Sequence, residues 1–157
     1  MRLLVFSDSH GRASGILDAL HDQPETAAVF FLGDGLHDIE FARQAYPRLP
    51  FHLVPGNCDY NPGALVAVDE CTCAGVRLLY THGHLFHVKG GTAAYLKEAQ
   101  ARGVRIALFG HTHVPALSYE EGIYLFNPGS IAQRSYGIID LPPAGIVCFH
   151  AFAEGRR

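Results

Sequence analysis

The stretch LLVFSDSHG, residues 3–11, joins four consecutive apolar residues to a polar turn that contains an aspartate and a histidine. An apolar run of this length is typical of a strand that is buried on both faces. The same plan recurs in VFFLGD, residues 29–34, and in FHLVPGNCD, residues 51–59. Between these runs, residues 13–22 and the segment before Pro47 carry apolar side chains at helical spacing. The opening third therefore predicts strand, helix, strand, helix, strand, the pattern of a parallel sheet covered by helices.

The rest of the chain is richer in strands. We expect one helix over residues 93–101, with Thr92 as its cap and Gly103 at its end. The predicted strands cover residues 66–73, 76–80, 105–109, 123–126, 137–141 and 146–152. A βαβ half followed by a strand-rich half predicts an α/β fold in which two sheets pack face to face with helices outside. We expect the 157 residues to form a single domain, 1–157.

Composition argues against several classes of function. Apolar residues make up 48% of the chain and charged residues 17%, which is an ordinary globular balance. The formal charge of −3 offers no basic face, so long nucleic acid is an unlikely partner. The apolar run at residues 3–6 is too short for a membrane span or for the core of an export signal. We therefore expect a cytoplasmic protein without a membrane partner.

The four cysteines give no complete metal motif. They contain no CxxC pair, which together with the missing export signal suggests free thiols in a reducing compartment. Cys71 and Cys73 are two residues apart, as in half of a zinc site, but no second pair completes one. We therefore interpret these two cysteines as ordinary strand residues.

Residues that can bind metal ions follow nearly every predicted strand. In chain order they are Asp8, His10, Asp34, Asn57, His82, His84, His111 and His113. Ligands of open α/β sheets gather beyond the carboxyl ends of the strands, so we expect these side chains to meet at one edge. Carboxylate, imidazole and amide groups suit the middle transition metals. A carboxylate shared by two divalent ions about 3.5–4 Å apart screens their repulsion, and Asp34 is the candidate bridge.

Each of these residues has a simpler explanation when it is taken alone. A histidine at a strand end is usually a surface side chain, Asp8 is suited to cap the first helix, and Gly56-Asn57 is a common turn. Their joint occurrence after successive strands favours a two-metal site instead. A shared Asp34 would give the two ions seven protein ligands and leave positions open for water and substrate.

Six sequence blocks, taken together, resemble the motifs of calcineurin-like metallophosphoesterases. In order they are Asp8-Ser9-His10, Gly33-Asp34, Gly56-Asn57-Cys58-Asp59, His82-Gly83-His84, Gly110-His111-Thr112-His113 and Asn127-Pro128-Gly129-Ser130. The last block is similar to one found in the small, single-domain branch of that family, which includes the YfcE-like phosphodiesterases. The blocks extend from residue 8 to residue 130 and so cover most of the chain.

The resemblance implies a four-layer α/β/β/α sandwich of two mixed sheets flanked by helices, with a dinuclear metal centre at one edge. It assigns Asp8, His10 and His113 to one ion, and Asn57, His82 and His111 to the other. Asp34 would bridge the two. The cofactors implied are two divalent transition-metal ions, with Mn²⁺ as the first choice and Zn²⁺, Fe, Ni²⁺ or Co²⁺ as alternatives.

The function that the resemblance implies is hydrolysis of small phosphodiesters by a metal-bound hydroxide. We expect His84 to orient the nucleophile or to contact the phosphate, together with Asn57, and Asp59 to orient a histidine. Arg134 is a candidate partner for a phosphate oxygen, although a solvated surface arginine explains it equally well. Larger members of the family carry histidine directly after the asparagine, where this chain has Cys58. We therefore expect faster turnover of esters with good leaving groups.

Other functions are compatible with parts of this pattern. Within the same fold they are a non-catalytic protein-interaction scaffold, a nuclease and a phosphomonoesterase. Scaffolds tend to have lost metal ligands, whereas all seven are present here. An amidohydrolase barrel would need roughly 250 residues, and an aspartyl-nucleophile phosphatase would need a second aspartate where His10 stands. The sequence leaves the oligomeric state open, and a homo-oligomer is compatible with it.

Overall fold

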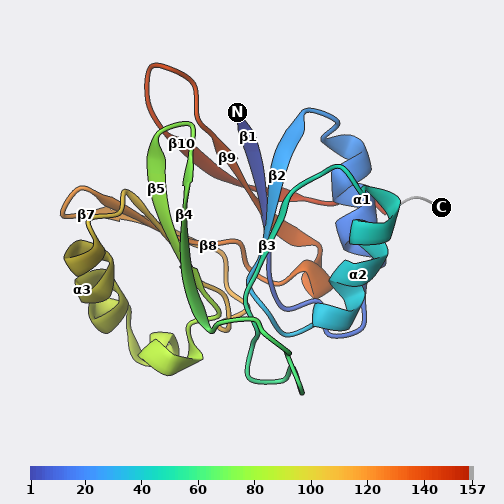
Figure 1. The fold of residues 1–157 in the computed structure, drawn as a ribbon, viewed down its shortest axis with the longest axis horizontal. Coiled ribbons are helices and arrows are strands. Elements are labelled where there is room, and N and C mark those ends of the chain that lie inside the picture. Colours follow the sequence, from blue (N-terminus) through green and yellow to red (C-terminus); the bar gives the residue numbers. More distant parts are fainter. Residues whose placement is uncertain (156–157) are drawn as a thin grey trace.

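The computed structural model describes residues 1–155 and consists of two five-stranded sheets between layers of helices (Figure 1). The first sheet has the strand order β10-β9-β1-β2-β3. Its strands are β1 (Arg2–Phe6), β2 (Thr26–Phe31), β3 (Phe51–Leu53), β9 (Ser135–Asp140) and β10 (Val147–Phe152). Strands β1, β2 and β3 are parallel, whereas β9 runs antiparallel to both β1 and β10. The first sheet is therefore mixed.

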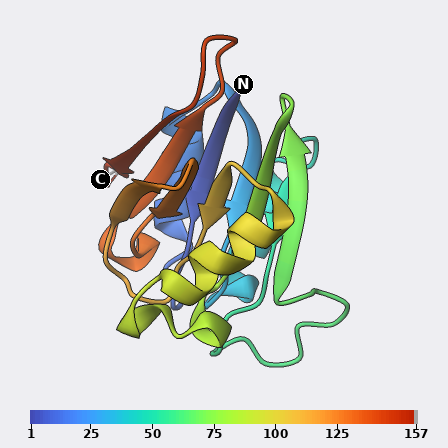
Figure 2. The same cartoon turned by 90° about the vertical axis from the view of Figure 1, so that its left-hand side faces the viewer.

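The second sheet has the strand order β4-β5-β6-β8-β7 and is also mixed. Its strands are β4 (Val68–Cys73), β5 (Val76–Thr81), β6 (Ile106–Leu108), β7 (Ala116–Glu120) and β8 (Ile123–Asn127). Helices α1 (Ser14–Asp22) and α2 (Leu36–Ala45) pack on the first sheet, and α3 (Ala93–Arg102) packs on the second. Figure 2 shows α3 lying across the outer side of its sheet. Three short 3₁₀ helices cover His84–Phe86, Val88–Gly90 and Ile131–Gln133.

Alternate residues of the central strands pack into two different cores. Leu3 and Val5 of β1 face the second sheet, whereas Leu4 and Phe6 pack under α1 and α2. This alternation follows from the two-residue period of a strand, and it explains why the run LLVF is apolar throughout. A third core lies between α3 and the second sheet. The expected α/β/β/α sandwich of two mixed sheets is confirmed.

Three details of the expected secondary structure differ from the structure. Strand β7 was missed because four of its five residues are exposed, so it shows no buried apolar run. Thr92 does occupy the cap position of α3, but its side chain makes no capping hydrogen bond. The strand expected from residue 66 begins at Val68.

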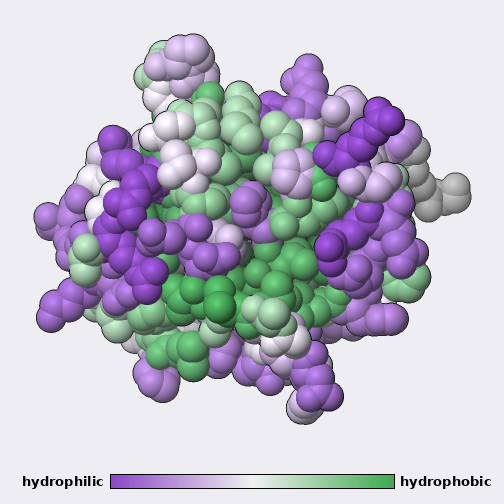
Figure 3. Space-filling view, viewed as in Figure 1, coloured by the Kyte–Doolittle hydropathy of each residue, from purple (hydrophilic) through white to green (hydrophobic). Residues whose placement is uncertain are grey.

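Figure 3 shows hydrophilic residues toward the left and right of this face, where the helices lie. Hydrophobic residues gather in the middle of the face, over the sheets. Among the helices of residues 1–155, none is both long enough and apolar enough to cross a membrane.

Candidate metal centre

All seven predicted ligands lie in loops that follow parallel strands. Asp8, Asp34 and Asn57 come after β1, β2 and β3 of the first sheet, and His82 and His111 come after β5 and β6 of the second. The carboxyl ends of parallel strands meet at one edge of a sheet. The face-to-face packing of the sheets then brings both sets of loops to the same end of the sandwich.

The backbone at this end is unusual. Five of the seven predicted ligands have a positive φ angle, between 43° and 67°: Asp8, His10, Asp34, His111 and His113. A residue with a side chain adopts this left-handed conformation at a cost on the order of 1–3 kcal/mol, and such residues cluster at functional sites. The surrounding structure must therefore hold the loops after β1, β2 and β6 in this conformation, so that the ligand side chains point into the site.

Asp8, His10 and His113 form the first ligand group. The Asp8 Oδ2 atom accepts hydrogen bonds from the Ser7 hydroxyl and the His111 N–H. Its other oxygen, Oδ1, is buried and accepts no hydrogen bond, although His113 Nε2 lies 3.2 Å away. The Nε2 atoms of His10 and His113 are also 3.2 Å apart. An unpaired carboxylate oxygen beside two converging imidazole nitrogens is an arrangement that a cation would complete.

Asn57, His82 and His111 form the second ligand group. His82 Nδ1 lies 2.7 Å from the Leu32 carbonyl oxygen, so this nitrogen is the donor and Nε2 of the neutral ring keeps its lone pair. That Nε2 lies 3.1 Å from Asn57 Oδ1, 3.1 Å from His111 Nδ1 and 3.4 Å from Asp34 Oδ2. Several acceptor atoms therefore converge on one point, which again suits a cation.

Asp34 lies between the two groups. Its Oδ2 atom is 3.9 Å from His10 Nε2 and 3.4 Å from His82 Nε2, while Oδ1 accepts the Cys58 N–H at 2.8 Å. Burial raises the pKa of the Asp34 carboxyl, but the adjacent His82 ring and the hydrogen bond from the Cys58 backbone outweigh this effect, so the pKa falls below its ordinary value. An ionised carboxylate with one free oxygen facing both groups has the properties of a bridge between two ions.

Comparison with known proteins shows the family of the chain. The sequence profile of the Calcineurin-like phosphoesterase superfamily domain matches residues 1–142. The chain belongs to the calcineurin-like phosphoesterase superfamily. It is 30% identical over 148 residues to a probable metallophosphoesterase, YsnB, of Bacillus subtilis, covering 90% of this chain and 85% of that protein.

Two further superfamily members are similar to this chain. The phosphodiesterase YfcE of Escherichia coli is 34% identical over 100 residues, which is 55% of this chain and 50% of that protein. A crystal structure of a Streptococcus pneumoniae protein described as a predicted phosphoesterase superposes with a TM-score of 0.75 at 25% identity. The superposition covers 96% of this chain and 97% of that one. The fold expected from the motif blocks is therefore that of the superfamily.

The carboxylate of Asp59 is hydrogen-bonded to backbone N–H groups of two loops. Its Oδ1 atom accepts the N–H groups of Gly35 and Leu36, and its Oδ2 atom accepts those of Asp34 and Gly56. Each of the four distances lies between 2.7 and 2.9 Å. None of its hydrogen bonds among residues 1–155 goes to a histidine. Asp59 fastens the loop after β2 to the loop after β3, and so positions Asp34 and Asn57.

His84 and Arg134 lie in different surroundings. The His84 ring centre is 5.4 Å from that of His82 and 6.2 Å from that of His111, and its Nδ1 atom is buried without a hydrogen-bond partner. Burial and the nearby His82 lower the pKa of His84, which keeps the ring neutral. The Arg134 guanidinium instead binds Asp18 of α1 at 3.0 Å and the Ala153 carbonyl. The structure therefore brings His84 to the centre and directs the Arg134 side chain to α1.

Three residues without a predicted role support the ligand loops. Ser130 donates its hydroxyl to the Asp8 carbonyl at 2.7 Å, and Ser7 donates to the Asp8 carboxylate. The Asn127 amide donates to the Gly110 carbonyl and to the Thr112 hydroxyl, both at 2.9 Å. The block at residues 127–130 was the available signal for two of these residues. Its polar groups hold the loops of Asp8 and His111 together.

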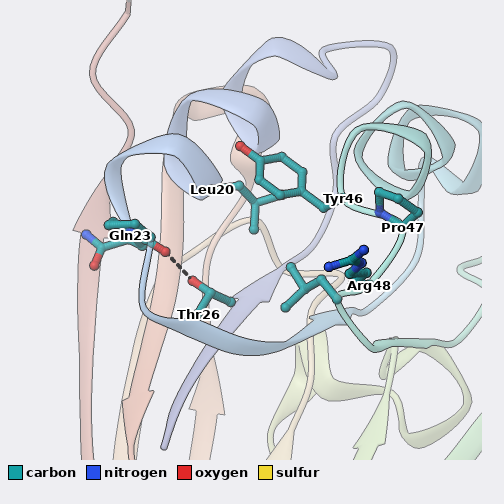
Figure 4. A pocket seen from close by; sticks show the side chains of 8 residues that line it. Leu20, Gln23, Thr26, Tyr46, Pro47 and Arg48 are labelled. Carbon is teal, nitrogen blue, oxygen red and sulfur yellow. Dashed lines mark hydrogen bonds between the residues drawn. The ribbon is translucent and has the colours of Figure 1, made fainter.

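A hollow of about 400 Å³ opens beside the centre and is lined by His10, Asp34, His37, Cys58 and Tyr60, among others. The Tyr60 side chain is 90% exposed at its rim. A second pocket, of about 470 Å³, lies between the ends of α1 and α2 (Figure 4). Its lining includes Leu20 and Tyr46 but no histidine, cysteine or carboxylate. Of these two hollows, the first contains the carboxylate and imidazole groups that a metal-dependent phosphoesterase site needs.

Proposed function

We propose that this chain is a phosphodiesterase that hydrolyses small phosphodiesters at a dinuclear metal centre. The observation that carries the proposal is the pair of ligand groups around Asp34, whose potential histidine and aspartate ligand atoms lie within 4.8 Å of one another in each group. One ion would be held by Asp8, His10 and His113. The other ion would be held by Asn57, His82 and His111. Asp34 would bind both ions. When bound there, two divalent ions supply a water of lowered pKa and positive charge against the phosphate oxygens.

Residues of this chain would position the phosphodiester. His84 is neutral, lies beside the second ligand group and has a buried nitrogen without a partner, so we propose that it contacts a phosphate oxygen or orients the nucleophile. The Asn57 side chain would contribute its amide to the same phosphate. Arg134 would need to release Asp18 before it could take part, and we place it outside the proposed substrate site.

The leaving group would lie in the hollow beside Cys58 and Tyr60. Burial raises the pKa of the Cys58 thiol, with the nearby Asp34 adding to the rise, so the thiol is a weak proton donor near neutral pH. An ester whose leaving group departs without protonation would therefore react fastest. The exposed ring of Tyr60 would offer an aryl group a surface to stack on.

We propose Mn²⁺ as the first choice of ion, and Zn²⁺, Fe, Ni²⁺ or Co²⁺ are compatible with the same site, because nitrogen and oxygen ligands suit all of these ions. The acidic net charge favours a small diester over long nucleic acid.

The test is hydrolysis of bis-p-nitrophenyl phosphate by metal-stripped protein, with Mn²⁺, Zn²⁺, Ni²⁺ or Mg²⁺ added separately. We expect metal-dependent release of nitrophenol that Asp34→Asn abolishes and that His21→Gln retains, since His21 is exposed at the end of α1. Two bound ions without turnover would indicate a narrower substrate requirement than this diester. If the protein binds no metal and shows no turnover, the proposal is overturned in favour of the interaction scaffold.

A further inference from the structure

A second cluster of metal-binding side chains lies away from the dinuclear centre. It consists of His52 on β3 and of Cys71 and Cys73 on β4, whose ligand atoms all lie within 4.8 Å of one another. The Sγ atoms of the two cysteines are 4.0 Å apart. Two thiols and one imidazole form a donor set that soft and borderline ions prefer. The sequence could not show this group, because its histidine precedes the cysteines by about twenty residues and belongs to the other sheet.

The topology explains how these side chains meet. Strand β3 is the last strand of the first sheet and β4 is the first strand of the second, so both are edge strands on the same side of the sandwich (Figure 1). Cys71 and Cys73 are alternate residues of β4 and therefore point to the same face, toward the core between the sheets. His52 reaches them from the neighbouring edge strand of the first sheet.

Packing fixes the orientation of the His52 ring. The ring stacks on Phe30 with a centroid distance of 4.6 Å and an interplanar angle of 13°, and Tyr80 meets it edge-on at 5.8 Å. The Tyr80 hydroxyl in turn donates to Asp69 at 2.8 Å. Within residues 1–155, no hydrogen bond is found for either ring nitrogen of His52, and the two thiols pack in the apolar core with a hydrogen-bond contact only to each other. The donor atoms are thus aligned but not used by the protein itself.

We propose that His52, Cys71 and Cys73 bind a Zn²⁺ ion that links the two sheets at this edge. A tetrahedral zinc ion with Zn–S bonds of about 2.3 Å holds two sulfur atoms roughly 3.8 Å apart, close to the separation here. A disulfide would need the sulfur atoms about 2.05 Å apart. Asp69 is engaged by Tyr80, which leaves the fourth position to water.

The charge balance also selects a divalent ion. Two thiolates and one neutral imidazole carry two negative charges, so Zn²⁺ makes the site neutral, whereas Cu⁺ would leave a net negative charge. A neutral site suits the apolar surroundings, which include Phe30 and Leu78. Burial raises the pKa of the Cys71 thiol to about 12, so without metal the thiol remains protonated, unlike the thiolate of a peroxide-sensing cysteine.

The location suggests what the ion does. Strand β3 leads directly into the loop that carries Asn57, and in the first sheet it is hydrogen-bonded only to β2. An ion that joins β3 to β4 would fix this edge strand from its free side. The zinc site shares no ligand with the dinuclear centre, so the two proposals stand or fall separately.

The experiment replaces the bound metal with Co²⁺ and records the near-ultraviolet absorption of cobalt–thiolate bonds. It uses the full chain with Cys58→Ser, which removes the thiol next to the dinuclear centre. We expect a thiolate charge-transfer band that weakens in Cys71→Ser and in Cys73→Ser, disappears when both are replaced, and persists in Cys148→Ser, the matched control on β10. The band should also persist in Asp34→Asn, which separates this site from the phosphodiesterase centre.

Metal content gives an independent measurement. Zinc-loaded protein with both Cys71→Ser and Cys73→Ser should contain about one ion per chain less than the Cys148→Ser control, with unchanged hydrolysis of the aryl diester. His52→Asn should keep the charge-transfer band but shift the visible cobalt bands, because one nitrogen ligand is lost. The proposal is overturned if the charge-transfer band is absent from the Cys58→Ser protein, or if it survives in the doubly substituted protein. A Cys71–Cys73 disulfide in protein kept under reductant would also overturn it.

Discussion

Replacing Asp59 by asparagine distinguishes a structural carboxylate from a catalytic one. The substitution keeps the shape of the side chain but turns one oxygen into an NH₂ group. Because each oxygen of Asp59 accepts two backbone N–H groups, either orientation of the amide leaves two N–H groups facing a donor. A hydrogen bond to a charged group contributes about 1.5–3 kcal/mol. Since Asp59 is only partly buried, we expect a loss of about 3 kcal/mol in the free energy of unfolding.

The same substitution should weaken metal binding, since Asp34 and Asn57 lie in the two loops that Asp59 joins. Loss of a residue that orients metal ligands typically lowers affinity by 10–100-fold. The measurements are urea unfolding of the metal-free protein and titration with Mn²⁺, each beside Glu25→Gln as an exposed control. If Asp59 oriented a catalytic histidine instead, kcat would fall while the unfolding free energy and the metal affinity stayed within error of the wild type. That outcome would refute the reasoning.

Three further substitutions test other parts of the structure. A Cβ atom at Gly56 would lie 2.0 Å from Asp34 Oδ1. Gly56→Ala should therefore abolish binding of the second metal ion in a calorimetric titration. Gly90 has open space around it, so the control Gly90→Ala should bind this ion normally. Cys58→Ser should leave hydrolysis of an aryl diester within about twofold of wild type, because a neutral thiol contributes little general-acid catalysis; a 100-fold loss would make the thiol a catalytic group. The hydrogen bond from Arg2 lowers the pKa of Asp140 in the folded protein. This ion pair therefore stabilises the fold above the unfolded pKa of about 3.9. The stabilisation is lost as the pH falls through the lower pKa of the folded state. Asp140→Asn should therefore cost about 1 kcal/mol in urea unfolding at pH 7 and progressively less as the pH falls below the unfolded pKa; a cost that does not change with pH would contradict the assignment.

The buried strands could be predicted from the sequence because a short apolar run identifies each of them. The runs before Asp8 and Asp34 are apolar at every position because each strand packs against two cores, and that signal needs no knowledge of the partners. The exposed strand β7 carries no such signal. The role of Asp59 was beyond the sequence for another reason, since its partners are backbone N–H groups, which every residue but proline offers. His52 meets Cys71 only because two sheet edges coincide, and no spacing rule records that.

The left-handed backbone of the ligand loops suggests why a dinuclear centre would need this scaffold. Glycine would adopt such φ angles without strain, but the centre requires a side chain at each position. The strain has to be offset by contacts between the loops. The Asp8 N–H donates to the Gly33 carbonyl at 2.9 Å, and the His10 N–H donates to the Asp34 carbonyl at 3.2 Å. The Asp34 N–H is held by Asp59, and the His111 N–H by the carboxylate of Asp8. Four of the five strained ligands are thus held by the loop of another ligand, so the side chains converge before any ion arrives. Loss of one loop contact should therefore disturb both ligand groups, because neither sheet could hold its half of the centre alone.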